Sequence, residues 1–215
     1  MSVVVAIKKG EVVYLGADSQ VTRGGTRETL SNPNNYKIWK VKNVDGCFMG
    51  HVGLLREANI VKLMNNLVSD YDVYNNYVDY EYIVKSVVPS IFDELKKYGY
   101  LKDEQFVKEI ESRFMFIFKD KIFTIGFDGA VIEVDDYAAI GSGEDQAIGS
   151  LLSTEGEEPV TRIVKAIKAS AASDIYVDYP IIITNSKDGV FDVVKETNES
   201  KYLKSKASLK AKEEH

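Results

Sequence analysis

Several residue types are scarce, and each shortage argues against a class of function. The 215-residue chain has one cysteine, Cys47, which cannot form an internal disulfide and suits a reducing compartment, so we expect a cytoplasmic protein. The two histidines, His51 and His215, leave almost no material for a histidine-based catalytic triad. A zinc site built from Cys47 and His51 would lack further soft ligands. We therefore expect neither a metal nor an organic cofactor.

Positive charge and long apolar runs are also in short supply. The chain has 27 Lys and Arg against 33 Asp and Glu, a net charge of −6, whereas phosphate binding needs clustered cations. No run is long and apolar enough to span a bilayer, and the first residues do not resemble a signal peptide. The glycines of residues 141–143 are followed by Glu144 and Asp145, which would repel a phosphate. We expect no nucleic acid, membrane or nucleotide as a partner.

The chain does contain enough apolar material for one substantial core. Hydrophobic residues make up 45% of the sequence and charged residues 28%, as in ordinary globular proteins. Neither a linker nor an internal repeat divides it, so we expect a single domain over residues 1–195. Residues 196–215 are charged and poor in apolar side chains, which predicts a frayed helix or a disordered tail.

Hydrophobic periodicity predicts alternating groups of strands and helices. In the first strand both faces lack charge, so both are expected to be covered. The order of the elements predicts an α+β fold, a four-layer α/β/β/α sandwich of two stacked antiparallel sheets. A tyrosine-rich loop, residues 71–79, separates the first two helices, and Pro89 is expected to kink the second. The predicted strands are residues 3–7, 12–17, 36–42, 114–119, 122–127, 131–134, 181–184 and 190–194, and the predicted helices are residues 53–69, 83–95, 145–152 and 159–172.

Ser2 stands immediately behind the initiator Met1, at the head of the first strand. A small second residue usually allows the initiator methionine to be removed, which would give Ser2 a free α-amine. Such an amine has a pKa of about 7.7–8.0, so much of it is a neutral base at cytoplasmic pH. One residue would then hold both a hydroxyl nucleophile and the base that activates it. The alternative is that many chains begin with Met-Ser and have no chemistry there.

Lys37 falls among apolar residues of the predicted strand 36–42. Alternation puts Lys37 on the face of Trp39, whereas Lys40 takes the opposite face and is expected in solvent. A lysine in apolar surroundings costs free energy unless an opposite charge holds it, and Asp18, at the end of the second strand, is a candidate partner. A lysine that extends to solvent from the strand end is equally compatible with the sequence.

These features follow one another in an order that resembles a known family. Ser2 leads the first strand, residues 16–19 (Gly-Ala-Asp-Ser) end the second, and residues 36–38 (Tyr-Lys-Ile) follow. Residues 48–53 and 139–143 each precede a helix. The ordered set is similar to β-type proteasome subunits and to the peptidase subunit of the bacterial two-component ATP-dependent protease, which are N-terminal nucleophile hydrolases. The resemblance covers roughly residues 2–195.

The resemblance implies a role for each matching residue. Ser2 would be the nucleophile, where the family most often has threonine. Asp18 would hold Lys37, whose positive charge would favour proton transfer from the nucleophile. The backbone N–H of Gly50 would donate to the oxyanion, because a glycine lets the substrate approach the main chain closely. Ser142 would orient the N-terminal amine.

One segment departs from the family's pattern. Eukaryotic and archaeal members have Asp-x-x-Ser-Gly after the last long helix, whereas residues 173–180 read Ser-Asp-Ile-Tyr-Val-Asp-Tyr-Pro here. Three arrangements remain open: Asp174 takes the place of that aspartate, Asp178 does, or backbone groups alone support the site.

Three functions are compatible with these residues. The first is a peptidase subunit that cleaves unfolded polypeptides inside a homo-oligomeric ring; having no phosphate loop, it would need a separate ATPase for energy-dependent unfolding. The second is an amidohydrolase of the same fold that acts on a small-molecule amide. The third is a non-catalytic ring subunit, which the retained Asp18 and Lys37 disfavour. The sequence does not decide between the first two, because loops form the substrate pocket.

Overall fold

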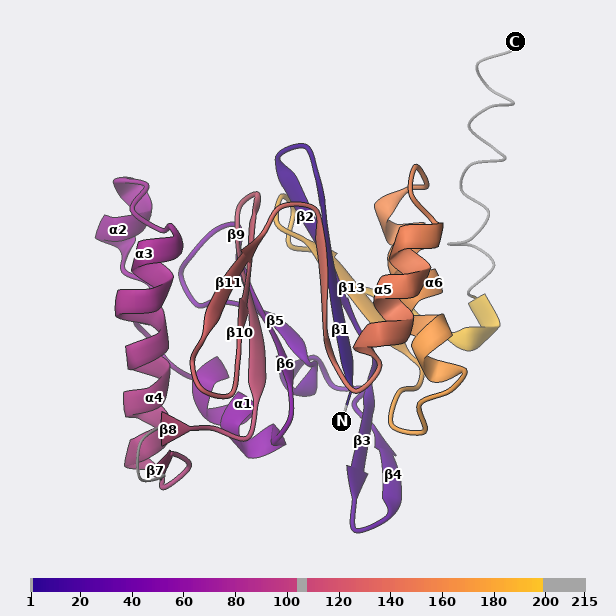
Figure 1. Ribbon diagram of the computed structural model, residues 1–215, viewed down its shortest axis with the longest axis horizontal. Coiled ribbons are helices and arrows are strands. Elements are labelled where there is room, and N and C mark those ends of the chain that lie inside the picture. The colour runs from indigo at the N-terminus through magenta and orange to yellow at the C-terminus, as the bar shows by residue number, and fades with distance from the viewer. Residues whose placement is uncertain (1, 104–107, 199–215) are drawn as a thin grey trace.

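A computed structural model of the protein describes residues 2–103 and 108–198, which form a four-layer α/β/β/α sandwich (Figure 1). Two five-stranded antiparallel sheets face each other, and helices cover the outer face of each. The predicted fold class is therefore confirmed. Among the described residues, no helix is long and apolar enough to cross a membrane.

The first sheet sets the position of the N-terminal segment. Its inner strand β1 pairs with β12 on one side and β2 on the other, so that Val3 lies opposite Gly141 and Val4 opposite Ala17. Ser2 therefore lies at the end of the sheet at which β12 and β2 both finish, just before the first residue of β1. In spatial order the strands are β12 (Tyr137–Gly141), β1 (Val3–Lys9), β2 (Val12–Ala17), β13 (Ile181–Asn185) and β14 (Asp192–Val194).

The second sheet carries the glycine-containing strand β6 beside the short strand β5. Ile38 of β5 lies opposite Gly50 of β6, which lies opposite Met115 of β9 on its other side. In spatial order the strands are β11 (Val131–Val134), β10 (Lys121–Ile125), β9 (Arg113–Phe118), β6 (Cys47–Val52) and β5 (Ile38–Lys40). Smaller pairs of strands are β3 (Gln20–Arg23) with β4 (Thr26–Thr29), and β7 (Lys102–Asp103) with β8 (Lys108–Glu109).

Two groups of helices form the outer layers (Figure 1). Helices α5 (Glu144–Ser153) and α6 (Pro159–Ala171) cover the first sheet. Helices α1 (Leu55–Lys62) and α4 (Val88–Lys97), with the π-helical turn η2 (Ile83–Val87), cover the second sheet. Short helical segments complete the list: η1 (Pro33–Asn35), α2 (Asp70–Tyr74), α3 (Tyr80–Tyr82) and η3 (Glu196–Asn198).

Alternation along the central strands divides the core into three apolar layers. Val3 and Val5 of β1 pack against α5 and α6, whereas Val4 packs between the two sheets. In β9, Phe116 faces α1 and α4, while Met115 faces the first sheet. Both faces of each central strand are therefore buried, as the lack of charge on both faces of residues 3–7 predicts.

Several predicted elements differ in the structure. The first helix is shorter than predicted, and the predicted loop 71–79 begins within α2. The hairpin β3–β4 has no counterpart in the prediction, because β4 is exposed throughout and lacks a periodic apolar signal. Pro89 lies in the first turn of α4, directly after the π-helical turn η2, so the predicted second helix is irregular next to the proline. In the predicted tail 196–215, η3 occupies the first three residues and the rest lies outside the described residues.

Candidate active site

Segments that are distant in sequence meet where β1 begins. The Nζ of Lys37 donates to the Oγ of Ser2 at 2.7 Å and to the two carboxylate oxygens of Asp18 at 2.9 and 2.8 Å. It also donates to the carbonyl of Gln20. These partners use the hydrogen-bonding capacity of the ammonium group. The ion pair that the sequence left open is therefore present, and it contacts the hydroxyl of Ser2.

Asp18 is held by the backbone as well as by the lysine. One of its oxygens accepts from the N–H of Val3 at 2.9 Å, and the other accepts from the N–H of Gln20 at 3.0 Å. Its side chain is fully buried, and the side chain of Lys37 is only 3% exposed to solvent. A buried charge needs a partner and satisfied hydrogen bonds, and this carboxylate has both.

The lysine lies on a different side of its segment from the side predicted. Strand β5 begins at Ile38, so the alternation of faces does not extend back to Lys37. Trp39 packs in the layer under α1 and α4, whereas Lys37 reaches residues of the first sheet, on the side where Ile38 packs. Burial lowers the pKa of Lys37, while the charges of Asp18 and Asp174 oppose that shift.

The backbone nitrogen of Ser2 is positioned by the turn that follows β12. It donates to the Oγ of Ser142 at 3.1 Å, and the N–H of Gly143 donates to the carbonyl of Ser2 at 3.4 Å. Gly141 has φ +115°, and a Cβ there would lie 2.1 Å from the carbonyl oxygen of Ser2. The close approach of this turn to Ser2 therefore requires glycine at position 141.

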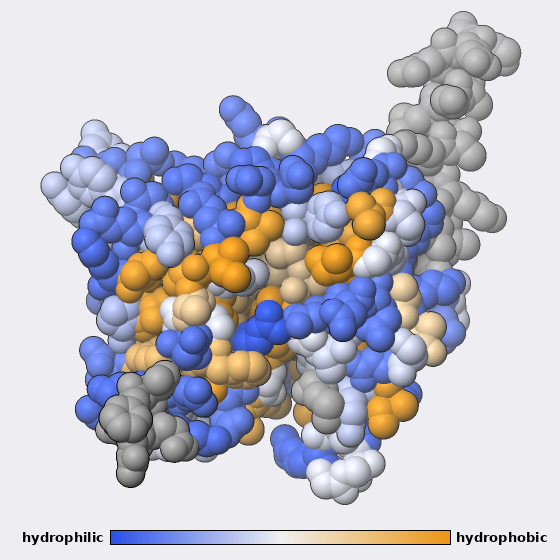
Figure 2. All heavy atoms as spheres, in the orientation of Figure 1, coloured by the Kyte–Doolittle hydropathy of each residue, from blue (hydrophilic) through white to orange (hydrophobic). Residues whose placement is uncertain are grey.

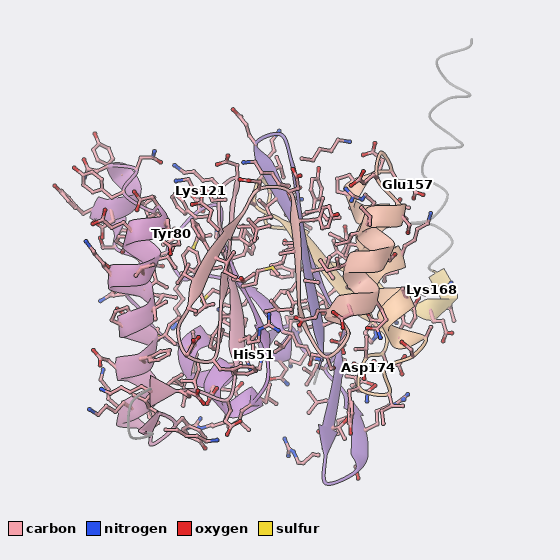
Figure 3. All side chains as sticks on the ribbon, viewed as in Figure 1. His51, Tyr80, Lys121, Glu157, Lys168 and Asp174 are labelled. Carbon is pink, nitrogen blue, oxygen red and sulfur yellow. The ribbon has the colours of Figure 1, made fainter. Side chains whose placement is uncertain are left out.

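The two aspartates after α6 have different surroundings. Asp178 bonds Arg27 at 2.6 Å, in a pair that is well exposed. Asp174 accepts from the N–H of Tyr176, and its other carboxylate oxygen is buried without a hydrogen-bond partner. The charge of Asp174 acts on Lys37. Asp178 also lies close by, because its carbonyl accepts from the N–H of Ser19 at 3.1 Å, so the charge effect on Lys37 is what distinguishes Asp174. Figure 3 shows Asp174 beyond the end of α6.

Gly50 does not occupy the position that the sequence suggested. In β6 the N–H of His51 donates to the carbonyl of Lys37, so that of its neighbour Gly50 points to the opposite side, where Met115 of β9 pairs with it. A Cβ on Gly50 would lie 2.6 Å from Val4, inside the layer between the sheets. The Gly50 N–H is therefore part of the sheet, and Gly50 is not among the residues that line the cleft beside Ser2 and Lys37.

Gly53, three residues later, has a backbone N–H that the pairing of the sheet leaves unused. The alternation that points the N–H of His51 toward β5 points that of Gly53 the same way, but β5 does not extend that far. Within residues 2–103 and 108–198, nothing accepts a hydrogen bond from it. Gly53 has φ +122°, and a Cβ there would lie 2.4 Å from the carbonyl oxygen of Glu111. The sequence contains this glycine in the segment 48–53 but does not say which of the two N–H groups is unpaired.

A cleft of about 620 Å³ opens onto these groups. Ser2, Lys37 and Gly53 line it together with His51. The Nε2 of His51 lies 3.0 Å from the Oγ of Ser112, and Figure 3 shows the ring on the second sheet. Burial, with the nearby charge of Lys37, lowers the pKa of His51 to about 3, so the imidazole is neutral near neutral pH. No cluster of His, Cys, Asp or Glu that could hold a metal occurs in the described part of the chain.

The chain resembles proteases in its sequence. The family model of the proteasome subunit matches residues 2–183. The ATP-dependent protease subunit HslV of Caldicellulosiruptor saccharolyticus is 27% identical over 184 residues, which cover 84% of this chain and 95% of the relative.

Solved structures share the fold at low sequence identity. The protein BPH of Thiobacillus denitrificans superposes with a TM-score of 0.64 at 16% identity, over 90% of this chain and 99% of that one. HslV of Trypanosoma brucei gives a TM-score of 0.60 at 18% identity, over 85% of this chain and 98% of that one. Because the family model spans most of the described residues, the chain belongs to the proteasome subunit family, among its β-type N-terminal-nucleophile peptidase subunits.

Proposed function

We propose that this subunit hydrolyses peptide bonds of unfolded polypeptides, with Ser2 as the nucleophile after removal of Met1. The observation that carries the proposal is the 2.7 Å contact between the Nζ of Lys37 and the Oγ of Ser2, made by a lysine that Asp18 fixes in place. A buried ammonium beside a hydroxyl favours the alkoxide that forms during attack. A surface lysine beside a serine would not be held in this way.

In the proposed reaction the α-amine of Ser2 takes the proton of Oγ while Oγ attacks the carbonyl carbon of the scissile amide. The N–H of Gly53 donates to the oxygen on which negative charge develops. The amine then passes the proton to the leaving nitrogen, and the C–N bond breaks. Water hydrolyses the resulting ester and restores Ser2.

The surrounding residues support this scheme by position. Ser142 is 3.1 Å from the nitrogen of Ser2, the distance needed to orient an amine. Asp174 adds negative charge near Lys37 and offsets the cost of burying that lysine. The roles assigned to Ser142 and Asp174 are therefore those of positioning residues.

We further propose that the subunit acts in a homo-oligomeric ring served by a separate ATPase. Large apolar side chains are exposed on β11 and α5, where Ile132 is 63% and Leu152 61% exposed. Figure 2 shows apolar side chains gathered on the face that carries these elements. Exposed apolar surface of this kind is typical of subunit interfaces. The relative from Caldicellulosiruptor is named as a subunit of an ATP-dependent protease, which suggests the same division of labour here.

Mass spectrometry and peptide hydrolysis test the proposal together. We expect intact protein from its native host to lack Met1 and to cleave fluorogenic peptides. We expect Ser2→Ala to lose at least about a hundredfold in kcat/KM with its circular dichroism unchanged. Retention of Met1 in all molecules, or undiminished turnover by Ser2→Ala, would rule out Ser2 as the nucleophile. Hydrolysis of acyl-amino acids but not of peptides would favour the small-molecule amidohydrolase instead.

A further inference from the structure

The charge of the cleft differs in sign from that of the chain. The protein has a net charge of −6. Among the described residues that line the cleft, however, Arg23, Lys37 and Arg56 are cationic and none is acidic. The buried ion pair with Asp18 neutralises the charge of Lys37, so the two arginines supply the remaining positive charge of the cleft.

Arg23 and Arg56 are also the arginines without an anionic or carbonyl partner among the described residues. Arg27 pairs with Asp178 and Arg113 with Glu144, each at 2.6 Å, and Arg162 donates to a backbone carbonyl. Arg56 lies 5.8 Å from the ring of Tyr98, which leaves its hydrogen-bond donors uncommitted. Guanidinium groups bind carboxylates in a bidentate geometry, through two parallel N–H···O hydrogen bonds. The donors of both arginines are available for such binding.

The two arginines come from different elements that line the same cleft as Ser2. Arg23 ends β3, and Arg56 lies in the first turn of α1, directly after the segment that contains Gly53. If Gly53 receives the oxygen of the attacked carbonyl, the side chain of that same substrate residue lies within reach of the first turn of α1.

We propose that this cleft selects an acidic side chain, so that the enzyme cleaves after aspartate or glutamate. Arg56 and Arg23 bind the carboxylate of the residue whose carbonyl Ser2 attacks. The inference rests on the proposed peptidase function and adds the class of substrate to it. The apolar lining residues, such as Leu54 and Leu55, favour the competing choice of an apolar side chain at that position.

Matched peptides test the choice directly. Four fluorogenic peptides differ only in the residue before the scissile bond, which is Glu, Gln, Leu or Lys. Because Glu and Gln have the same shape, their ratio isolates the charge, and we expect kcat/KM for Glu to exceed that for Gln by about tenfold to a hundredfold. Arg56→Gln and Arg23→Gln lower this ratio toward one. The ratio is measured within each variant, so it does not depend on the fraction of folded protein.

Arg27→Gln is the matched control, because Arg27 belongs to the same hairpin but pairs with Asp178 in an exposed ion pair. It preserves the Glu-to-Gln ratio of the wild type. Equal cleavage of the Glu and Gln peptides, or faster cleavage of the Leu peptide, overturns the acidic preference while leaving the peptidase intact. If no peptide is cleaved, the proposed function fails, and fluorescence anisotropy of the same peptides bound to Ser2→Ala decides the charge preference on its own.

Discussion

At the scale of single residues, the site depends on which polar groups are satisfied within the fold and which remain open to the cleft. Asp18 and Lys37 satisfy each other with the help of backbone groups. The N–H of Gly53 has no partner among the described residues. An enzyme that stabilises developing charge needs such prepositioned donors, because they do not have to reorganise when the charge appears.

A methyl group added at Gly53 tests its assignment. Residue 53 has a φ of +122°, and an added Cβ would lie only 2.4 Å from the Glu111 carbonyl oxygen, so Gly53→Ala must shift the main chain. We expect a loss of about a hundredfold or more in kcat. Gly50→Ala adds the same methyl against Val4, so it lowers the melting temperature but largely keeps the turnover of folded molecules. Steady-state kinetics below both melting transitions separate the two; a larger loss of turnover in Gly50→Ala would contradict the assignment.

His51 makes stability depend on pH. Its pKa is lowered from 6.5 to about 3 in the folded protein, so below pH 6.5 the unfolded chain binds a proton that the folded chain excludes. Stability therefore falls as the pH drops from 6.5 toward 3, by at most about 1.4 kcal/mol per pH unit from this residue. Urea unfolding at several pH values within that window measures the slope. We expect His51→Gln, which does not titrate, to flatten it; parallel slopes would show that His51 is not responsible.

At the scale of elements, Lys62 connects α1 to the segment that carries Lys37. Its Nζ donates to the carbonyls of Asn34 and Tyr36 at 2.9 and 2.7 Å and lies 4.9 Å from the ring of Trp39. The segment that precedes β5 has little regular structure beyond η1, so these contacts fix where Lys37 enters the site. Helix α1 thus supports the segment that carries Lys37 from the outer layer.

Lys62→Met removes these hydrogen bonds while keeping most of the apolar stem. We expect the free energy of unfolding to fall by about 1–2 kcal/mol and kcat to fall as well, because Lys37 is less firmly placed. Lys62→Arg, which retains charge and donors, restores most of the rate. Lys42→Met is the control. Lys42 also donates its hydrogen bonds near the C-terminal end of α1, to the carbonyl of Leu63 and the side chain of Asn65, but these bonds are exposed. Equal rates in the Met and Arg variants of Lys62 would argue against a positioning role.

At the scale of the whole molecule, the exposed apolar face of β11 and α5 predicts assembly. We expect multi-angle light scattering at micromolar concentration to give a mass several times the 24.1 kDa of one chain. Leu152→Glu places a charge on that face and shifts the mass toward the single chain, because an unpaired charge is costly in an interface. Val190→Glu is the control, since Val190 is equally exposed but lies in the β13–β14 turn. A wild-type protein of single-chain mass would reject the ring.

The architecture was predictable because it depends on local periodicity. Alternation in β1 and spacing in α6 are properties of short segments, so the layers follow from sequence. The β3–β4 hairpin was not predictable, since its strands bury little and their pattern lacks an apolar period. That hairpin nevertheless supplies Arg23 and one wall of the cleft.

The sequence by itself determined the candidates for the chemistry: Ser2 behind the initiator, and the charges of Asp18 and Lys37. Only the tertiary structure shows that the N–H of Gly50 pairs within its sheet while that of Gly53 has no partner among the described residues. It also shows that Asp178 pairs with Arg27 whereas the charge of Asp174 acts on Lys37. The physical reason is the same in both cases. Whether an N–H or a carboxylate is open to a substrate depends on what the rest of the fold places beside it, such as the early end of β5 or the guanidinium of Arg27. Residue type sets what a group can do, and neighbours distant in sequence decide whether it is available.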